Sequence, residues 1–336
     1  MTSSSTPPVS SSVISATLKL LGEVSTSGQG RRVAFSPDGS TWAASASGAI
    51  WLGEGLRPTR VLRVPGVGGD LLRFSGDGRL LASPRAVELS SGALLETPEL
   101  LAGSLNAELP LFIPVASVWD PEGVRVLAAV RYQPPRGRGT ATHGRADLEG
   151  PPARLVLVDA TSGELVATLW EAASQAPEAV AAEGRTLAAA ALTVQLWDRQ
   201  TLVARGELAG HRHTVRHLVL TPDGRLLASG AADGEVGLWD ALAATRLALW
   251  PAHASEARGL ALHPRLPLLA TGGGDGRLRL WSLDSPPRLL ADEAEPGPVD
   301  ALAFSPDGGQ LLVAARGDRP GVRLYGVAAE GRFVLP

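Results

Sequence analysis

Three histidines, His211, His213 and His217, lie close together in the chain and are candidate ligands for a metal ion. Imidazole nitrogens are common ligands of transition metals. Such a site needs three or four converging ligands, and no nearby carboxylate completes this set. The chain has no cysteine, which excludes thiolate ligands, disulfides and cysteine nucleophiles. We therefore expect no bound metal.

A glycine-rich run, GGGDG at 272–276, is a candidate phosphate-binding loop. Such a loop needs Gly-Lys-Ser/Thr at the start of a helix, and the only lysine is Lys19. Neither a G-x-S-x-G nor an H-E-x-x-H motif is present. We expect no cofactor and no catalysis. Spacing alone does not separate a catalytic carboxylate pair from turn-forming aspartates, so an enzyme stays an alternative.

The elements that hold these residues are organised by a repeated turn motif, which the chain contains in seven copies. The copies are SPDG at 36–39, SGDG at 75–78, DPEG at 120–123, AAEG at 181–184, TPDG at 221–224, HPRL at 263–266 and SPDG at 305–308. Their third residues are 39 to 45 residues apart, except for one interval of 61. The regular spacing indicates seven equivalent structural units.

Each unit carries short β-rich runs separated by turn residues, and residues 215–250 show this most clearly. The runs there are VRHLVL at 215–220, RLLASG at 225–230, EVGLWD at 235–240 and TRLALW at 245–250. Four antiparallel strands cannot bury both of their faces alone, but seven such sheets stacked radially can. We predict an all-β, seven-bladed propeller of four-stranded antiparallel blades with almost no helix.

The best copies resemble the signature of WD-repeat proteins in GH at 210–211, ASG at 228–230, an Asp at 233 and LWD at 238–240. In that family a His, a Ser or Thr, an Asp and a Trp form a hydrogen-bonded tetrad that stabilises the blade. The resemblance implies two such tetrads. They are His211, Ser229, Asp233 and Trp239 in blade five, and His253, Thr271, Asp275 and Trp281 in blade six.

The other blades depart from this signature, most visibly at the Trp position. That position holds Gly53, Ser90, Val158, Trp197 and Tyr325 in blades one to four and seven. Blades one to four lack the full tetrad, so we expect apolar packing to hold them. Residues 16–23 and 332–335 are rival candidates for the strand that closes the ring. The family commonly uses an N-terminal strand, which favours 16–23.

Composition sets the remaining limits. Residues 1–15 are rich in Ser, Thr and Pro and are predicted to be a disordered tail before a propeller over 16–336. No apolar run is long enough to span a membrane, and no secretory signal is visible. A net charge of −3 disfavours nucleic acid as the partner. The absence of cysteine suits a cytoplasmic protein, and the near-absence of lysine suggests a bacterial, GC-rich genome.

The resemblance also implies where a partner docks. In WD-repeat propellers the residue six before the Pro of SPDG begins the innermost strand at the rim of the top face. Here those positions hold Arg31, Asp70, Val115, Ala176, Arg216, Arg258 and Asp300. Arginine forms planar pairs with carboxylates, so Arg31, Arg216 and Arg258 are predicted to contact an acidic peptide. The acidic Asp70 and Asp300 disfavour a polyanion.

Blade three carries an insert at 133–153, which includes Arg136 and Arg138 and is predicted to reach over the same rim. We therefore expect a non-catalytic scaffold that binds a protein or peptide on its top face, with Arg136 and Arg138 among the contacts. Two alternatives remain. One is a hydrolase or lyase using the central funnel, and the other is a subunit of a bacterial regulatory or defence complex.

Overall fold

The computed structural model describes residues 15–26, 30–46, 49–63, 72–76, 78, 80–82, 85–87, 112–132, 152–159, 162, 164–172, 176–317 and 320–330. Within those ranges every regular element is a β-strand. The strands form six four-stranded sheets and one three-stranded sheet, all antiparallel. This confirms the predicted all-β class. No helix that could cross a membrane occurs in the part of the chain so described.

The sheets follow one another along the chain, and each is built almost entirely from consecutive strands. The first two contain β2 (Gly30–Phe35), β3 (Trp42–Ala46), β4 (Ala49–Glu54) and β5 (Arg57–Arg63), then β6 (Leu72–Phe74), β7 (Leu80–Ala82) and β8 (Arg85–Val87). The next two contain β9 (Phe112–Trp119), β10 (Arg125–Tyr132), β11 (Ala153–Asp159) and β12 (Leu165–Ala172), then β13 (Ala179–Glu183), β14 (Thr186–Ala190), β15 (Val194–Asp198) and β16 (Ala204–Leu208). The last three contain β17 (Val215–Leu220), β18 (Leu226–Ala231), β19 (Glu235–Asp240) and β20 (Thr245–Pro251), then β21 (Ala257–Leu262), β22 (Leu268–Gly273), β23 (Arg277–Ser282) and β24 (Arg288–Ala294), then β25 (Val299–Phe304), β26 (Gln310–Ala315), β27 (Gly321–Glu330) and β1 (Ser15–Ser25).

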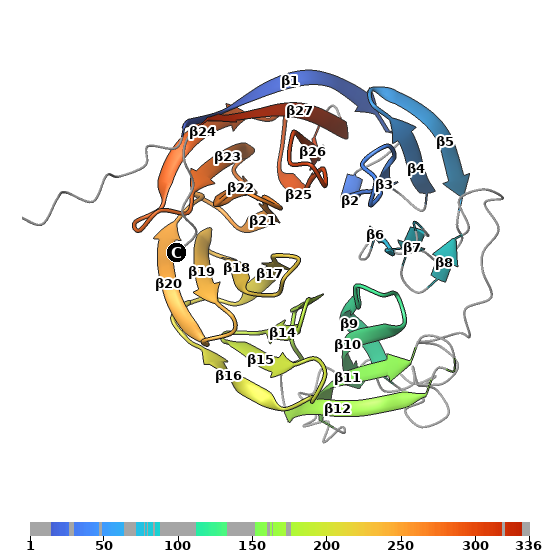
Figure 1. The fold of residues 1–336 in the computed structure, drawn as a ribbon, viewed down its shortest axis with the longest axis vertical. Coiled ribbons are helices and arrows are strands. Elements are labelled where there is room, and N and C mark those ends of the chain that lie inside the picture. The colour runs from blue at the N-terminus through green and yellow to red at the C-terminus, as the bar shows by residue number, and fades with distance from the viewer. Residues whose placement is uncertain are drawn as a thin grey trace, which may run out of the picture.

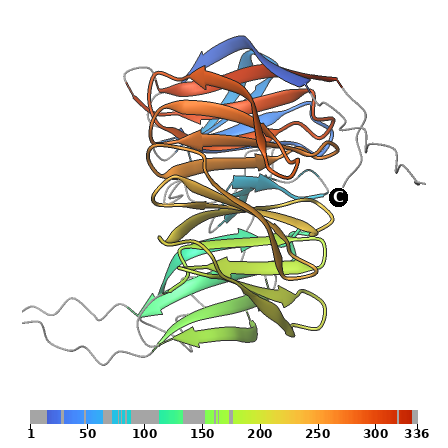
Figure 2. The same cartoon turned by 90° about the vertical axis from the view of Figure 1, so that its left-hand side faces the viewer.

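The seven sheets surround a common centre, each with its first strand innermost (Figure 1). Seen from the side, neighbouring sheets are stacked face to face (Figure 2). The innermost strands contact one another in the order β9, β13, β17, β21, β25, β2 and β6, so the last sheet adjoins the first. This arrangement is consistent with a propeller.

The repeated turn motif connects the first and second strands of a sheet. In the first copy the N–H of Gly39 donates to the carbonyl of Ser36 at 2.9 Å, and Asp38 accepts bonds from Ser36 Oγ and from the N–H of Ser40. Gly39 has φ +73°, which a residue with a side chain adopts only at a cost. The sequence Ser-Pro-Asp-Gly therefore forms this turn through its own side chains.

The second strand of a sheet lies deepest in the fold. All residues of β3, β14, β18 and β22 are buried, which fits their runs of Ala, Gly and Leu. Neighbouring sheets cover both faces of such a strand, so the usual alternation of polar and apolar residues is lost. A Cβ on Gly272 would lie only 2.3 Å from Cγ1 of Val299, so the small residues permit close packing between sheets.

The outermost strand of the last sheet comes from the start of the chain. Strand β1 pairs antiparallel with β27 from Ser15↔Glu330 to Ser25↔Gly321. The rival segment 332–335, the tail 1–14 and residues 133–151 of the insert lie outside the described residues, as does any fourth strand of the second sheet.

Candidate functional site

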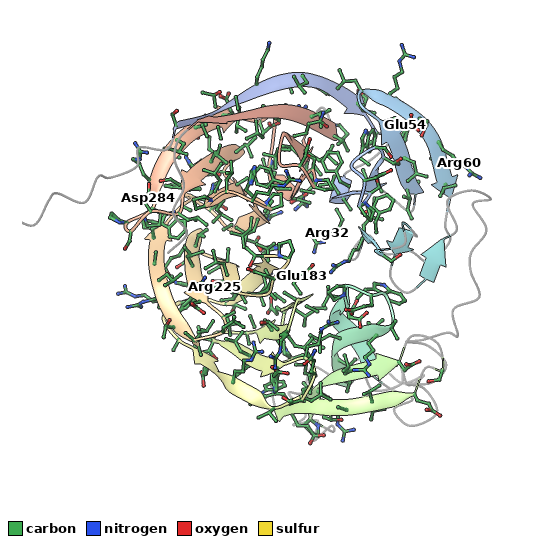
Figure 3. The ribbon with its side chains drawn as sticks, in the orientation of Figure 1. Arg32, Glu54, Arg60, Glu183, Arg225 and Asp284 are labelled. Atoms are coloured by element: carbon green, nitrogen blue, oxygen red, sulfur yellow. The ribbon has the colours of Figure 1, made fainter. Side chains whose placement is uncertain are left out.

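Two adjoining cavities lie at the centre, between the innermost strands. The mouth, of about 380 Å³, is lined by Arg32, Glu178, Arg216, His217, Glu256, Arg258, Asp300 and Arg316. The throat, of about 270 Å³, shares six of these residues and continues between aliphatic side chains. Those are Val33, Val118, Val180, Leu218, Val219, Leu260 and Leu302. In Figure 3, Arg32 projects into this central space. The site is therefore a funnel with a charged mouth and a throat in which aliphatic residues join the charged ones.

β-Bulges place three of the charged residues at the mouth. The pairing of β17 with β18 skips from Val215 to His217, which leaves Arg216 as an extra residue. The pairing of β21 with β22 skips Arg258 in the same way, and the pairing of β25 with β26 skips Asp300. A bulged residue departs from the alternation of the strand, so its side chain is redirected. Here all three side chains line the mouth.

The charged side chains alternate in sign around the mouth, and we call the series Glu178, Arg216, Glu256, Arg258, Asp300 and Arg316 the charged belt. Arg216 lies 3.6 Å from both Glu178 and Glu256. Arg258 lies 3.1 Å from Glu256 and 3.2 Å from Asp300. Asp300 also accepts a 2.7 Å bond from Nη2 of Arg316. The belt links four successive sheets and holds its side chains in defined positions.

His217 lies beside the belt, with Nε2 3.9 Å from Oε1 of Glu256. Burial, together with the positive charges of Arg32, Arg258 and Arg216, lowers the pKa of His217 to about 3. The imidazole is therefore neutral at physiological pH, and it can donate and accept one hydrogen bond.

The structure brings together Arg216, Arg258 and Asp300 of the predicted rim, and it surrounds both arginines with carboxylates. The other five lining residues were not predicted at the rim, although His217 was a candidate metal ligand; they are Arg32, Glu178, His217, Glu256 and Arg316. Arg32 and His217 each follow a bulge by one residue, a signal that strand register reveals. The predicted contacts Asp70, Arg136 and Arg138 lie outside the described residues, as does the side chain of Arg31.

The tetrad expected in the sheet β21–β24 is present as a chain of hydrogen bonds. Asp275 is an acceptor only, so Nδ1 of His253, 3.0 Å away, carries the proton. Nε2 then accepts from Oγ1 of Thr271 at 2.8 Å, and this oxygen accepts from Nε1 of Trp281 at 2.9 Å. Burial lowers the pKa of His253, which keeps the ring neutral.

In the sheet β17–β20 the prediction for Asp233 is wrong. His211 bonds Ser229 at 2.7 Å, and Trp239 donates to the same hydroxyl at 2.7 Å, but Nδ1 of His211 meets Glu235 at 3.2 Å. Asp233 is exposed and accepts the N–H of Glu235 within its own turn. In the next sheet the position of Glu235 is held by Arg277, whose guanidinium cannot accept a hydrogen bond. There the histidine, His253, meets Asp275 instead.

The last and the first sheets lack a tetrad, and other buried side chains form hydrogen bonds within them. Tyr325, at the Trp position, donates to Glu295 at 2.6 Å, and Glu295 lies 3.0 Å from Nη1 of buried Arg323. Arg323 also pairs with Glu23 of β1 at 3.2 Å, which ties the outermost strand to the sheet. In the first sheet Trp42 is buried over Gly53 and donates to the carbonyl of Gly55 at 2.8 Å.

The comparisons with known proteins agree with this description. A family model described as WD domain, G-beta repeat, matches residues 203–240 and 244–282. Each matched segment starts near the outer strand of one sheet and ends in the third strand of the next, and together they contain both His-Ser/Thr-Trp groups. No curated protein matches the chain. The matches support a WD-repeat family.

The candidate metal ligands His211 and His213 have other partners. Among the residues that the structure describes, no three His, Asp or Glu side chains are grouped so that they could hold a metal ion. His211 is engaged by Ser229 and Glu235, and the exposed His213 lies 3.9 Å from Asp233.

Proposed function

We propose that this chain is a seven-bladed WD-repeat propeller, closed by β1, which acts as a non-catalytic scaffold. It binds a peptide or protein segment over the mouth, on the top face of the disc, with Arg216, Arg258 and Asp300 as contacts. Arg31, Asp70 and the insert 133–153 with Arg136 and Arg138 belong to the same face in this proposal. The protein acts in the cytoplasm, alone or within a larger complex.

The charged belt is the observation that supports this proposal best. Three of its side chains stand on strand bulges and all six take part in mutual ion pairs, so little conformational entropy is lost when a partner binds. Arg216 is still 47% exposed and can offer its guanidinium to a carboxylate of a partner. Complementary charge of this kind gives specificity more than affinity.

The test is affinity capture from cells, with quantitative mass spectrometry, followed by binding of the purified partner. Wild type is compared with Arg216→Glu and with a variant in which residues 134–152 are replaced by a Gly-Ser linker. Arg60→Glu is the control, because Arg60 lies on the outermost strand β5, far from the mouth (Figure 3). We expect the Arg216→Glu protein to lose a partner that the Arg60→Glu protein retains. Equal capture by all four proteins would place the interface elsewhere.

An enzyme that works in the funnel is the second candidate, because the mouth brings His217 together with Glu256 and arginines. A histidine whose pKa is about 3 is a weak general base at neutral pH, since proton transfer is most efficient near the operating pH. Turnover of a carboxylate or phosphate ester, or of a lyase substrate, that is abolished by His217→Gln would favour this candidate over the scaffold.

A further inference from the structure

The eight described side chains that line the mouth offer both signs of charge to a ligand. Four are arginines, three are carboxylates, and His217 is neutral. A single carboxylate on a ligand can pair with the arginines, whereas a run of acidic residues would also meet Glu178, Glu256 and Asp300. The mouth is therefore suited to one carboxylate.

The throat adds a second requirement. Its lining adds aliphatic residues, among them Val33, Val219 and Leu302, to Arg32, Arg216 and Arg258, which line both cavities. Binding sites for small molecules usually measure about 300–1,000 Å³, so a throat of about 270 Å³ is large enough to take an apolar side chain. A ligand that fits carries its carboxylate next to an apolar group.

A salt bridge lies at the end of strand β13 that is opposite to Glu178. Strand β13 starts beside Glu178 at the mouth and ends at Glu183, which pairs at 2.8 Å with Arg73 of β6. Nη1 of Arg73 also approaches the carbonyls of Trp119 and Ala182 at 3.4 Å. These contacts join three innermost strands, β6, β9 and β13.

We propose that the funnel captures the free C-terminus of a partner protein whose last residue is apolar. The terminal carboxylate lies among Arg32, Arg216 and His217, the last side chain enters the throat, and the preceding residues leave through the mouth. This inference rests on the proposed function, since it names the segment that the scaffold holds. A small aliphatic acid has the same chemistry and is distinguished from a chain end in the test.

The probe is a pool of N-terminally labelled octapeptides that end in Leu with a free carboxylate. Matched pools end in Leu amide or in Asp. Retention on the immobilised full-length protein is measured by mass spectrometry, and single binders are measured by fluorescence polarisation, with 4-methylpentanoate as competitor. We expect amidation to weaken binding by about tenfold or more, because a charge-assisted hydrogen bond is lost. If 4-methylpentanoate displaces the peptide only at concentrations far above that of the peptide, the chain end and not a small aliphatic acid is the ligand.

Two variants locate the binding. Arg32→Gln removes a cation, and Val219→Phe fills the throat, and each is expected to weaken binding by about tenfold. Their controls are Arg60→Gln and Val203→Phe, the latter at a position 63% exposed, and both are expected to bind like wild type. Thermal melting verifies that all four remain folded.

Equal binding of the acid and amide pools, or no retained peptide in any pool, would overturn the C-terminal inference. Loss of the captured partner by Arg216→Glu would still support the proposed function in that case. Unchanged capture by Arg216→Glu would reject the scaffold interface at the mouth whatever the peptides do.

Discussion

Nδ1 of His211 lies 3.2 Å from Oε2 of Glu235, and the same ring bonds Ser229 through Nε2. Glu235 is the first residue of β19, whereas His211 lies in the loop before β17, so this contact joins two parts of one sheet. Burial lowers the pKa of His211, which leaves a neutral ring whose two nitrogens are both engaged. The contact therefore contributes to the stability of the sheet.

Replacing Glu235 should destabilise the protein more than replacing Asp233. Glu235→Ala leaves Nδ1 of the buried His211 without its acceptor, which costs about 1–3 kcal/mol. Asp233→Ala removes only a turn bond at an exposed site, for which about 1 kcal/mol or less is expected. Urea unfolding measures both. A larger loss for Asp233→Ala would contradict the assignment of Glu235.

The packing of Trp42 on Gly53 predicts that Gly53 tolerates no side chain. A Cβ there would lie 2.1 Å from Cζ2 of Trp42 and 2.8 Å from the carbonyl oxygen of Arg57. Gly53→Ala should cost about 1–3 kcal/mol, as overpacked cores do. Gly76→Ala is the matched control, because its Cβ would meet nothing within 4 Å, and it should leave the unfolding free energy nearly unchanged. Equal effects of the two changes would contradict the packing.

His263 should make the protein less stable in mild acid. Its Nδ1 accepts the N–H groups of Arg265 and Leu266 at 3.1 and 2.9 Å, and burial lowers its pKa to about 4. The unfolded chain has the higher pKa, about 6.5, and takes up a proton first as the pH falls. Stability that is complete above pH 6.5 is therefore lost as the pH falls towards 4, by up to about 3 kcal/mol from this residue.

The measurement is urea unfolding of wild type and His263→Asn at pH 7.5, 5.5 and 4.5. We expect the variant to be less stable at pH 7.5 and to lose less on acidification. His213→Gln is the control, since its side chain is 62% exposed, and it should follow the wild-type pH dependence. Parallel curves for wild type and His263→Asn would show that another group causes the acid sensitivity.

Tyr325 should be required for the buried cluster of the last sheet. Tyr325→Phe keeps the ring but removes the 2.6 Å bond to Oε1 of Glu295, and this buried oxygen then lacks its hydroxyl donor. A loss of about 1–3 kcal/mol in unfolding free energy is expected. Chemical denaturation at pH 7 measures it, and a variant as stable as wild type would indicate that Arg323 alone satisfies Glu295.

Local chemistry explains what the sequence predicts well. Each turn forms through contacts within about four residues, as Ser36, Asp38 and Gly39 show, so the motif itself reveals the turns and the strands beside them. The resemblance to WD-repeat proteins places Arg216, Arg258 and Asp300 at the rim, because each stands six residues before the second residue of the motif. His253, Thr271, Asp275 and Trp281 likewise have the spacing of the tetrad that this resemblance implies.

The tertiary structure alone decides which partners these residues meet. Arg216 pairs with Glu178 and Glu256 because the preceding and following sheets bring those carboxylates to it, and no spacing within one repeat contains that information. The exchange of Asp233 for Glu235 depends on which carboxylate the turn leaves available and which one reaches the ring. The pairing of Glu23 with Arg323 joins opposite ends of the chain. Turns are specified by neighbours in sequence, whereas the charges of the mouth are set by neighbours in space.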